Sequence, residues 1–191
     1  MRQLVLFMHV SLDGFVASPN GEMDWIKLDD NVFEYAGKQT DISDTALYGR
    51  KTYEMMEDYW PTAADHPQAS KHDKQYAEWY NKVAKIVVSK TMEGKHLPNT
   101  SVISHNITAE VIKLKEAAGK DIVIFGSPSV AHLLMEENLI NDYWIFVNPV
   151  LIGSGILLFN NIKHRISLRL TEHKVFESGV VCLHYKTIIL K

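Results

Sequence analysis

The chain has 191 residues, with 20 Lys and Arg against 23 Asp and Glu, and 46% of its residues are hydrophobic. This composition excludes a disordered or collagen-like chain, and the length suits one α/β domain over residues 1–191. The formal net charge of −3 gives no general attraction to nucleic acid or to an anionic membrane, so any anion site must be built locally.

The single cysteine, Cys182, excludes an intrachain disulfide and a cysteine-based metal site, and it favours a cytoplasmic protein. The first residues form a short apolar run, which His9 and Ser11 interrupt before it reaches the length of a signal peptide. No window approaches the roughly 18 apolar residues that span a bilayer. The nine histidines are scattered without metal-ligand spacing. We therefore expect no metal site and no membrane segment.

Strands and helices alternate over the first two thirds of the chain. Short apolar runs predict buried strands, and apolar residues at helical spacing predict helices. The expected strands are 4–10, 45–48, 85–89, 101–104 and 121–125. The expected helices are 32–39, 51–59, one within 62–82, 108–118 with Gly119 as its C-cap, and one that begins at Ser127 or Pro128.

The last third of the chain has the residue pattern of β-strands. Residues 142–152 predict a long aromatic strand, and residues 166–176 and 180–189 predict an antiparallel pair joined by a turn at Gly179. The whole pattern predicts a three-layer α/β/α fold, with a mixed, mostly parallel sheet and an antiparallel C-terminal hairpin. Apolar surface on these last strands predicts a homodimer.

One junction between a strand and a helix carries the parts of a phosphate site. Gly49 allows close approach of the backbone, Arg50 and Lys51 supply positive charge, and Thr52 supplies a hydroxyl at the start of a helix. The alternative is an ordinary helix start with solvated cations. The junction matches neither G-x-G-x-x-G nor the Walker A pattern, so a Rossmann site or a P-loop is not indicated.

Two further strand ends have related chemistry. Gly126 and Ser127 open a helix that carries Ser129 in its first turn, which suits a second phosphate on the backbone amides. The other strand end is polar and cationic, and its residues are Ser89, Lys90 and Thr91. Because ligands of open α/β sheets gather at the carboxyl ends of strands, these segments together favour a nucleotide ligand.

Two carboxylates follow the first strand. Asp13 lies in a Ser-Leu-Asp-Gly segment, and Asp24 lies beside Trp25, where a raised pKa would suit proton transfer. The alternative is that Asp13 belongs to a turn and that Asp24 caps a helix. His9 lies in the first strand near these residues, as a cofactor contact or as a hydrogen-bonded core histidine.

In this order, the segments resemble the dihydrofolate reductase-like superfamily, and within it the reductase domain at the C-terminal end of bifunctional riboflavin-biosynthesis proteins. The resemblance covers nearly the whole chain. The residues that carry it are 11–17 (SLDGFVA), 49–54 (GRKTYE), 88–91 (VSKT), 123–127 (VIFGS), 139–143 (LINDY), 149–155 (PVLIGSG) and 178–181 (SGVV).

The resemblance implies an NADPH-dependent reductase, of the dihydrofolate reductase or 5-amino-6-(5-phosphoribosylamino)uracil reductase type. Such an enzyme transfers hydride to a C=N or C=O bond of a flat heterocycle or a sugar-derived substrate. The loop from Asp13 to Asp24 would close on the nicotinamide, and Asp24, Asp13 or a bound water would pass the proton.

The resemblance also implies which residues hold the cofactor. The adenosine 2′-phosphate and the neighbouring phosphate would fall to Arg50, Lys51, Thr52, Ser89 and Lys90. Gly49, Thr91 and His9 are further expected contacts of the cofactor. The pyrophosphate would fall to Gly126, Ser127 and Ser129. A 2′-phosphate site requires Arg or Lys, and a plain NADH site does not.

Two other functions stay open at this point. The chain has Phe125-Gly126-Ser127 where dihydrofolate reductases show two or three glycines. A catalytically inactive nucleotide-binding protein of this fold is therefore one alternative, and a dimeric scaffold is the other. Binding and oxidation of NADPH separate the reductase from both.

Overall fold

The computed structural model describes residues 1–160 and 162–188 and divides the chain into two compact units. Unit 1 consists of Met1–Arg2 and Asp30–Val123, and unit 2 consists of Gln3–Asp29 and Ile124–Lys191. Strand β6 (Asp121–Phe125) crosses the boundary, because its first three residues belong to unit 1 and its last two to unit 2. The single domain expected over residues 1–191 stays a prediction.

Unit 1 alternates helices with parallel strands. Its strand order is β5-β4-β3, and both pairs are parallel. Parallel neighbours need crossover connections: helices lie between β3 and β4, whereas residues 89–99 connect β4 to β5 without a helix. The elements are α1 (Asp30–Ile42), β3 (Ser43–Gly49), α2 (Arg50–Tyr59), the 3₁₀ helix η1 (Trp60–Asp65), α3 (Lys71–Lys82), β4 (Ala84–Val88), β5 (Thr100–Ile103) and α4 (Ile107–Glu116).

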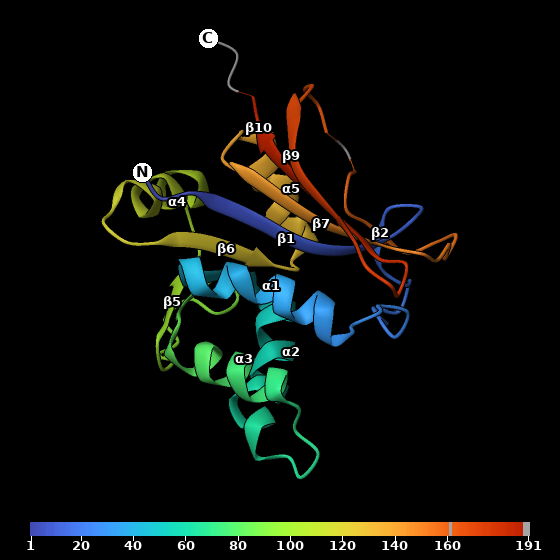
Figure 1. Ribbon diagram of the computed structural model, residues 1–191. Coiled ribbons are helices and arrows are strands. Elements are labelled where there is room, and N and C mark those ends of the chain that lie inside the picture. Colours follow the sequence, from blue (N-terminus) through green and yellow to red (C-terminus); the bar gives the residue numbers. More distant parts are fainter. Residues whose placement is uncertain (161, 189–191) are drawn as a thin grey trace. The chain divides into compact units, whose positions relative to one another are not determined.

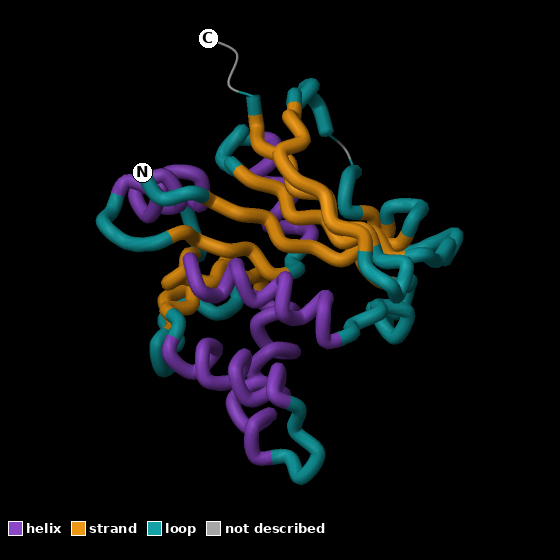
Figure 2. The backbone as a smooth tube through the Cα atoms, viewed as in Figure 1, coloured by secondary structure: helices purple, strands orange, loops and turns teal. Residues whose placement is uncertain are grey.

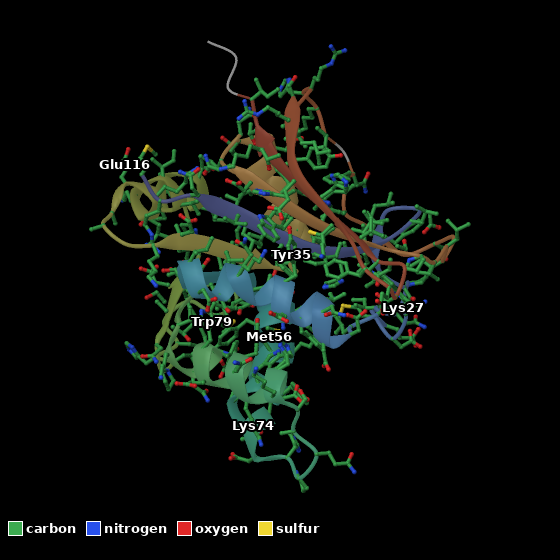
Figure 3. The ribbon with its side chains drawn as sticks, in the orientation of Figure 1. Lys27, Tyr35, Met56, Lys74, Trp79 and Glu116 are labelled. Carbon is green, nitrogen blue, oxygen red and sulfur yellow. The ribbon has the colours of Figure 1, made fainter. Side chains whose placement is uncertain are left out.

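Helix α3 confirms the helix expected within residues 62–82. The Ser70 hydroxyl accepts a hydrogen bond from the Asp73 amide at 3.1 Å, and the Asp73 carboxylate accepts one from the Ser70 amide at 2.8 Å. This capping box fixes the helix start. Figure 3 labels Met56 on α2, whose side chain is buried, and Trp79 on α3.

The prediction that Gly119 caps α4 is wrong. The helix ends at Glu116, and the C-cap is Ala117 in an extended conformation. Gly119 instead has φ +152°, and a Cβ there would lie 2.9 Å from Asp44 Oδ2 and 3.0 Å from Arg2 Cζ. The glycine is needed for this close approach to the ion pair that Arg2 forms with Asp44.

Arg2 and Asp44 form part of a larger polar network in unit 1. The Arg2 guanidinium also donates to the Thr45 hydroxyl at 2.6 Å, and the Lys120 amide donates to Asp44 at 2.8 Å. Partial burial opposes ionisation of Asp44, but the Lys120 amide, the Thr45 hydroxyl and the Arg2 charge together hold its pKa below the ordinary value.

Unit 2 is built on a second set of strands, in the order β1-β7-β10-β9 (Figure 1). Strands β1 and β7 pair in parallel, and β10 pairs antiparallel with both β7 and β9. The secondary structure thus confirms a mixed, mostly parallel α/β fold with antiparallel C-terminal strands. The elements are β1 (Leu4–Ser11), β2 (Phe15–Ala17), α5 (Pro128–Glu136), β7 (Asp142–Asn148), β8 (Ile156–Leu157), β9 (Leu168–Val175) and β10 (Val181–Thr187).

Two strands of unit 2 differ from the expected ones. The aromatic strand stops at Asn148 rather than at Ile152, because Pro149 has no amide proton for the ladder. Strand β9 is exposed at every position except the half-buried Leu168, which is the pattern of an edge strand. The expected hairpin is otherwise confirmed, although Ile189 lies outside the described residues.

A small two-stranded sheet of β2 and β8 escapes prediction from sequence, because each strand has only two or three residues. It lies between long loops that Figure 2 shows in teal. Leu158, directly after β8, is fully buried, and its amide donates to the Gly14 carbonyl at 3.0 Å. Among the described residues, no helix combines the length and the apolar character that crossing a membrane requires.

Gly155→Ala should destabilise this sheet. Gly155 has φ +150°, and a Cβ there would lie 2.1 Å from the Ala17 carbonyl oxygen, so the backbone of β2 would have to move. We expect a loss of about 3 kcal/mol in the free energy of unfolding. Gly153→Ala is the matched control, because Gly153 also has a positive φ but open space around it, and it should cost about 1 kcal/mol. Denaturant titration measures both losses, and equal losses would contradict the packing described.

Candidate functional site

The cationic strand ends of unit 1 lie at one edge of its sheet. Gly49 pairs with Val88 in the parallel register of β3 and β4. The segment Arg50–Thr52 follows β3, and the segment Ser89–Thr91 follows β4. Because parallel strands end at the same edge, the register brings both segments together there. We call residues 49–52 with residues 89–91 the β3/β4 edge.

Several contacts order the β3/β4 edge. The Arg50 guanidinium donates to both carboxylate oxygens of Glu54, at 2.8 and 3.1 Å. The Ser89 hydroxyl lies 3.2 Å from the Thr91 hydroxyl, and the Ser89 amide donates to the Ile103 carbonyl at 3.0 Å. The Ser89 and Thr91 hydroxyls thus lie close together, and Glu54 orients the Arg50 guanidinium.

The start of α2 and two lysines complete this edge. Gly49 is the N-cap residue, and no side chain caps the helix, so its first amide groups can face an anion. Lys51 and Lys90 are exposed, and neither forms an ion pair within residues 1–160 and 162–188. The edge thus offers three cations and three hydroxyls, of which Glu54 engages one cation.

The second glycine junction lies in unit 2, between β6 and α5. Gly126 and Ser127 both have left-handed backbones, with φ of +64° and +59°. The Ser127 carbonyl accepts from the amides of Val130 and Ala131, each at 3.0 Å, and Ser129 is exposed. A left-handed serine costs roughly 1–3 kcal/mol, and such strain is concentrated at functional sites.

Asp13 connects the loop after β1 to the loop after β7. Its carboxylate accepts from the Ser11 hydroxyl at 2.6 Å, from the Gly153 amide at 2.8 Å and from the Ile152 amide at 3.2 Å. The Ser11 hydrogen bond, followed by those two amides, lowers the pKa of Asp13. A carboxylate with these partners is a strong acceptor and a poor proton donor at neutral pH.

Asn148 is the polar centre of unit 2, and the sequence analysis missed it. Its fully buried amide nitrogen donates to the carbonyls of Val10 and Phe146, each at 3.2 Å, and lies 3.5 Å from Nδ1 of His9. Its amide oxygen accepts from the Lys27 backbone amide at 2.9 Å. One side chain thus joins β1, β7 and the loop before α1. Its only sequence signal is the Asn-Pro pair that ends the aromatic strand.

His9 lies among aromatic rings on the same face of the strands. It stacks on Phe146 with ring centroids 4.8 Å apart, and its ring edge meets Phe7 at 5.8 Å. Phe7 in turn packs against Phe125 at 5.1 Å. Burial lowers the pKa of His9 from 6.5 to about 4, so the imidazole is neutral at pH 7.

Asp24 caps no helix, because α1 begins at Asp30. It is exposed, in the loop between β2 and α1 that also carries Trp25 and Lys27 (Figure 3). Asp30, which the sequence analysis missed, is the carboxylate in the first turn of α1. Its sequence signal is a position two residues before the predicted helical run, which begins at Val32. The described residues hold no group of three or more side chains that could bind a metal ion.

The buried His9 should make stability depend on pH. Its folded pKa of about 4 lies below the unfolded value of about 6.5. The free energy of unfolding is therefore at its full value above pH 6.5 and decreases as the pH falls toward 4. The loss amounts to roughly 3 kcal/mol. His9→Gln has no charge to gain, so its free energy of unfolding should fall less over this window. Urea titrations at pH 7, 5.5 and 4 test this, and parallel curves for the two proteins would contradict it.

Comparison with known proteins identifies the family. Residues 2–182 match the family model of the RibD C-terminal domain. The uncharacterized protein YyaP of Bacillus subtilis (strain 168) is 34% identical over 185 residues, which cover 96% of this chain and 94% of YyaP. The uncharacterized protein YwjB of the same organism is 30% identical over 187 residues, which cover 96% and 97% of the two chains.

Solved structures share the fold at low sequence identity. A Shewanella sp. PV-4 protein named for riboflavin biosynthesis has a TM-score of 0.76 at 19% identity, with 98% of this chain and 99% of that chain covered. A pyrimidine reductase-like protein from Corynebacterium diphtheriae has a TM-score of 0.69 at 13% identity, with 98% and 92% covered.

A Thermotoga maritima deaminase/5-amino-6-(5-phosphoribosylamino)uracil reductase also has a TM-score of 0.69, at 14% identity, and the match covers 98% of this chain but 57% of that one. These three structures show the fold, which is the dihydrofolate reductase-like one expected from the sequence. The family match and the two Bacillus relatives extend over nearly the whole chain, so the protein belongs to the RibD C-terminal domain family.

Proposed function

We propose that the protein is an NADPH-dependent reductase that transfers hydride to a C=N or C=O bond of a flat heterocycle, such as a pyrimidine, or of a sugar-derived substrate. The observation that carries this proposal is the β3/β4 edge, where cations and hydroxyls from two strand ends meet beside a helix start. Family membership supports a reductase, and two structural neighbours carry reductase in their names.

The β3/β4 edge fits a phosphomonoester. A 2′-phosphate carries close to two negative charges near pH 7 and several acceptor oxygens, as other phosphomonoesters do. Arg50, Lys51 and Lys90 would supply charge, while the hydroxyls of Thr52, Ser89 and Thr91 would donate hydrogen bonds. The bound cofactor supplies the hydride. The protein's part is to hold and orient it.

Glu54 would tune this site. Its carboxylate holds the Arg50 guanidinium in place, with both residues less than half exposed. A phosphate that binds Arg50 must compete with that carboxylate or share the guanidinium with it. Glu54 therefore orients Arg50 but weakens its attraction for an anion.

The second glycine junction and the loop after β1 would serve the rest of the cofactor. Gly126, Ser127 and Ser129 are proposed to hold the pyrophosphate, where the left-handed backbone of the first two residues leaves their carbonyls and amides in an unusual orientation. His9, neutral at pH 7, is proposed to line the nicotinamide side.

Proton transfer to the substrate is proposed to involve Asp24 or a bound water. Asp24 is exposed in the loop before α1 and can reach solvent protons. Asp13 was the other candidate, but its carboxylate is occupied by Ser11, Ile152 and Gly153, which suits a role in holding the loop. A cytoplasmic location, which agrees with the single cysteine Cys182, stays a prediction.

Replacing Arg50 and Lys51 together by Ala should weaken NADPH binding by about 50-fold or more, because each charge-assisted contact to a phosphate contributes roughly 1.5–3 kcal/mol. NADH lacks the 2′-phosphate, so its affinity should change by less than about threefold. Quenching of Trp fluorescence on titration with each nucleotide measures both affinities.

Two comparisons control this experiment. Lys71→Ala with Lys74→Ala removes two exposed cations from α3 of the same unit, and should leave both affinities unchanged. Glu54→Gln removes the competing carboxylate and should tighten NADPH. Equal losses of affinity for NADPH and NADH in the Arg50/Lys51 variant would contradict the proposal that the β3/β4 edge binds the 2′-phosphate.

A homodimer is proposed through the open edge of β9. In the strand order of unit 2, β9 is terminal, and Leu170 and Val175 are 46% and 63% exposed. An exposed edge with apolar side chains favours pairing with a second copy. The aromatic strand β7, also expected at the interface, is instead paired on both sides and buried.

Sedimentation velocity at micromolar concentration should show a dimer, and Leu170→Lys should shift the equilibrium toward monomer. Leu151→Lys is the control, since Leu151 is 69% exposed but lies outside every strand. A monomeric wild-type protein would contradict the proposed dimer but would not bear on the proposed cofactor site.

A further inference from the structure

Unit 2 contains a cavity of about 440 Å³ that shares no residue with the proposed cofactor contacts. Its volume lies in the range of small-molecule sites. Met135 at the end of α5 and Tyr143 of β7 form a floor that is almost completely buried. The remaining apolar lining comes from the segment before β9, and its residues are Phe159, Ile162, Ile166 and Leu168.

Three hydrogen bonds hold the segment before β9 in place. The His132 ring nitrogen lies 2.6 Å from the Leu158 carbonyl oxygen, and the Lys163 amide donates to Glu136 at 2.9 Å. Further along, the Ile188 amide donates to the Ser167 carbonyl at 2.8 Å.

The rim of the cavity is basic. Lys163, His164 and Arg165 follow one another along the segment and all line the hollow. The Lys163 ammonium is committed to the Glu136 carboxylate at 3.1 Å. His164 and Arg165 are exposed, and within the described residues Arg165 makes no ion pair and no side-chain hydrogen bond. Among residues 1–160 and 162–188, the positive charge of Arg165 at the rim therefore has no paired carboxylate.

An apolar hollow with an unpaired guanidinium at its rim favours a ligand that has both an apolar body and a negative charge. An apolar ligand body would bury the exposed faces of Phe159 and Ile162, which are 46% and 41% exposed. An anionic head would pair with Arg165 in the planar geometry that guanidinium groups favour for carboxylate or sulfonate oxygens. A neutral ligand would leave the charge unused, and a cation would be repelled.

We propose that this cavity is a binding site for an amphipathic organic anion, with an aromatic or aliphatic body in the hollow and a carboxylate- or sulfonate-type head at Arg165. The site is independent of the reductase site, because none of its lining residues belongs to the β3/β4 edge or to the Gly126 junction. It holds whether or not the protein turns over NADPH.

The probe is 8-anilinonaphthalene-1-sulfonate, whose fluorescence rises in an apolar site, titrated into the full-length folded protein. We expect saturable binding of one molecule per chain, and at least a tenfold loss of affinity in Arg165→Glu. Lys74→Glu is the control, since Lys74 is an exposed cation on α3 that does not line the cavity, and it should bind the dye as the wild type does.

A second variant tests the hollow itself. Ile162→Asp places a carboxylate on the apolar wall at an exposed position, so the fold should persist while the probe is repelled. Thermal melting checks that each variant stays folded, because a partly unfolded chain also binds this dye. NADPH affinity should be unchanged in all three variants.

Two results would overturn the proposal. One is the absence of saturable dye binding to the wild-type protein up to about 1 mM, which corresponds to a binding free energy weaker than roughly −4 kcal/mol. The other is an equal loss of dye affinity in Arg165→Glu and Lys74→Glu, which would mean that general surface charge alone attracts the dye. Failure of NADPH to bind the same preparation would count against the reductase alone.

Discussion

The parallel register of β3 and β4 is the constraint on which the account of function depends. Two strands that run in the same direction end at the same edge, and the pairing of Gly49 with Val88 sets how far each strand extends. A shift of one residue would send the following side chains to the opposite face. The register therefore places Arg50 and Ser89 at the same end of the sheet, although 39 positions separate them in the sequence (89 − 50).

Unit 2 depends on a different kind of constraint, which is the satisfaction of backbone groups in its loops by side chains. Asn148 binds backbone groups of β1, of β7 and of the loop before α1, and Asp13 binds the amides after β7. Buried polar groups without partners are costly, so these two side chains stabilise the loops next to the strands that carry His9. Most contacts of these two side chains are with backbone groups, so their role is to hold the loops in place.

Much of the secondary structure follows from local signals. The helices are recognisable because apolar residues recur at helical spacing and because glycine, proline or a capping serine stands at their ends, as with Ser70 before α3. The buried strands are short apolar runs. Phosphate-binding residue types at Gly49–Thr52 could also be recognised, since they adjoin both a strand and a helix.

Other features depend on contacts that no local pattern reveals. The amide of Asn148 meets Val10 across 138 positions, and the carboxylate of Asp13 meets Gly153 across 140. Gly119 has the composition of a helix cap, but its φ of +152° is used to approach Arg2 and Asp44. The sheet of β2 and β8 is too short to leave a periodic signal, and the lining of the basic cavity comes from α5, β7 and the segment before β9, which are separate in the sequence.

The most direct test of the central claim is a titration of the isotope-labelled protein with 2′,5′-ADP, followed by amide chemical shifts, with 5′-AMP as the reference ligand. Only the 2′-phosphorylated nucleotide should shift the amides of Gly49–Thr52 and Ser89–Thr91 together. Equal shifts from both ligands, or shifts that leave one of these two segments unmoved, would contradict it.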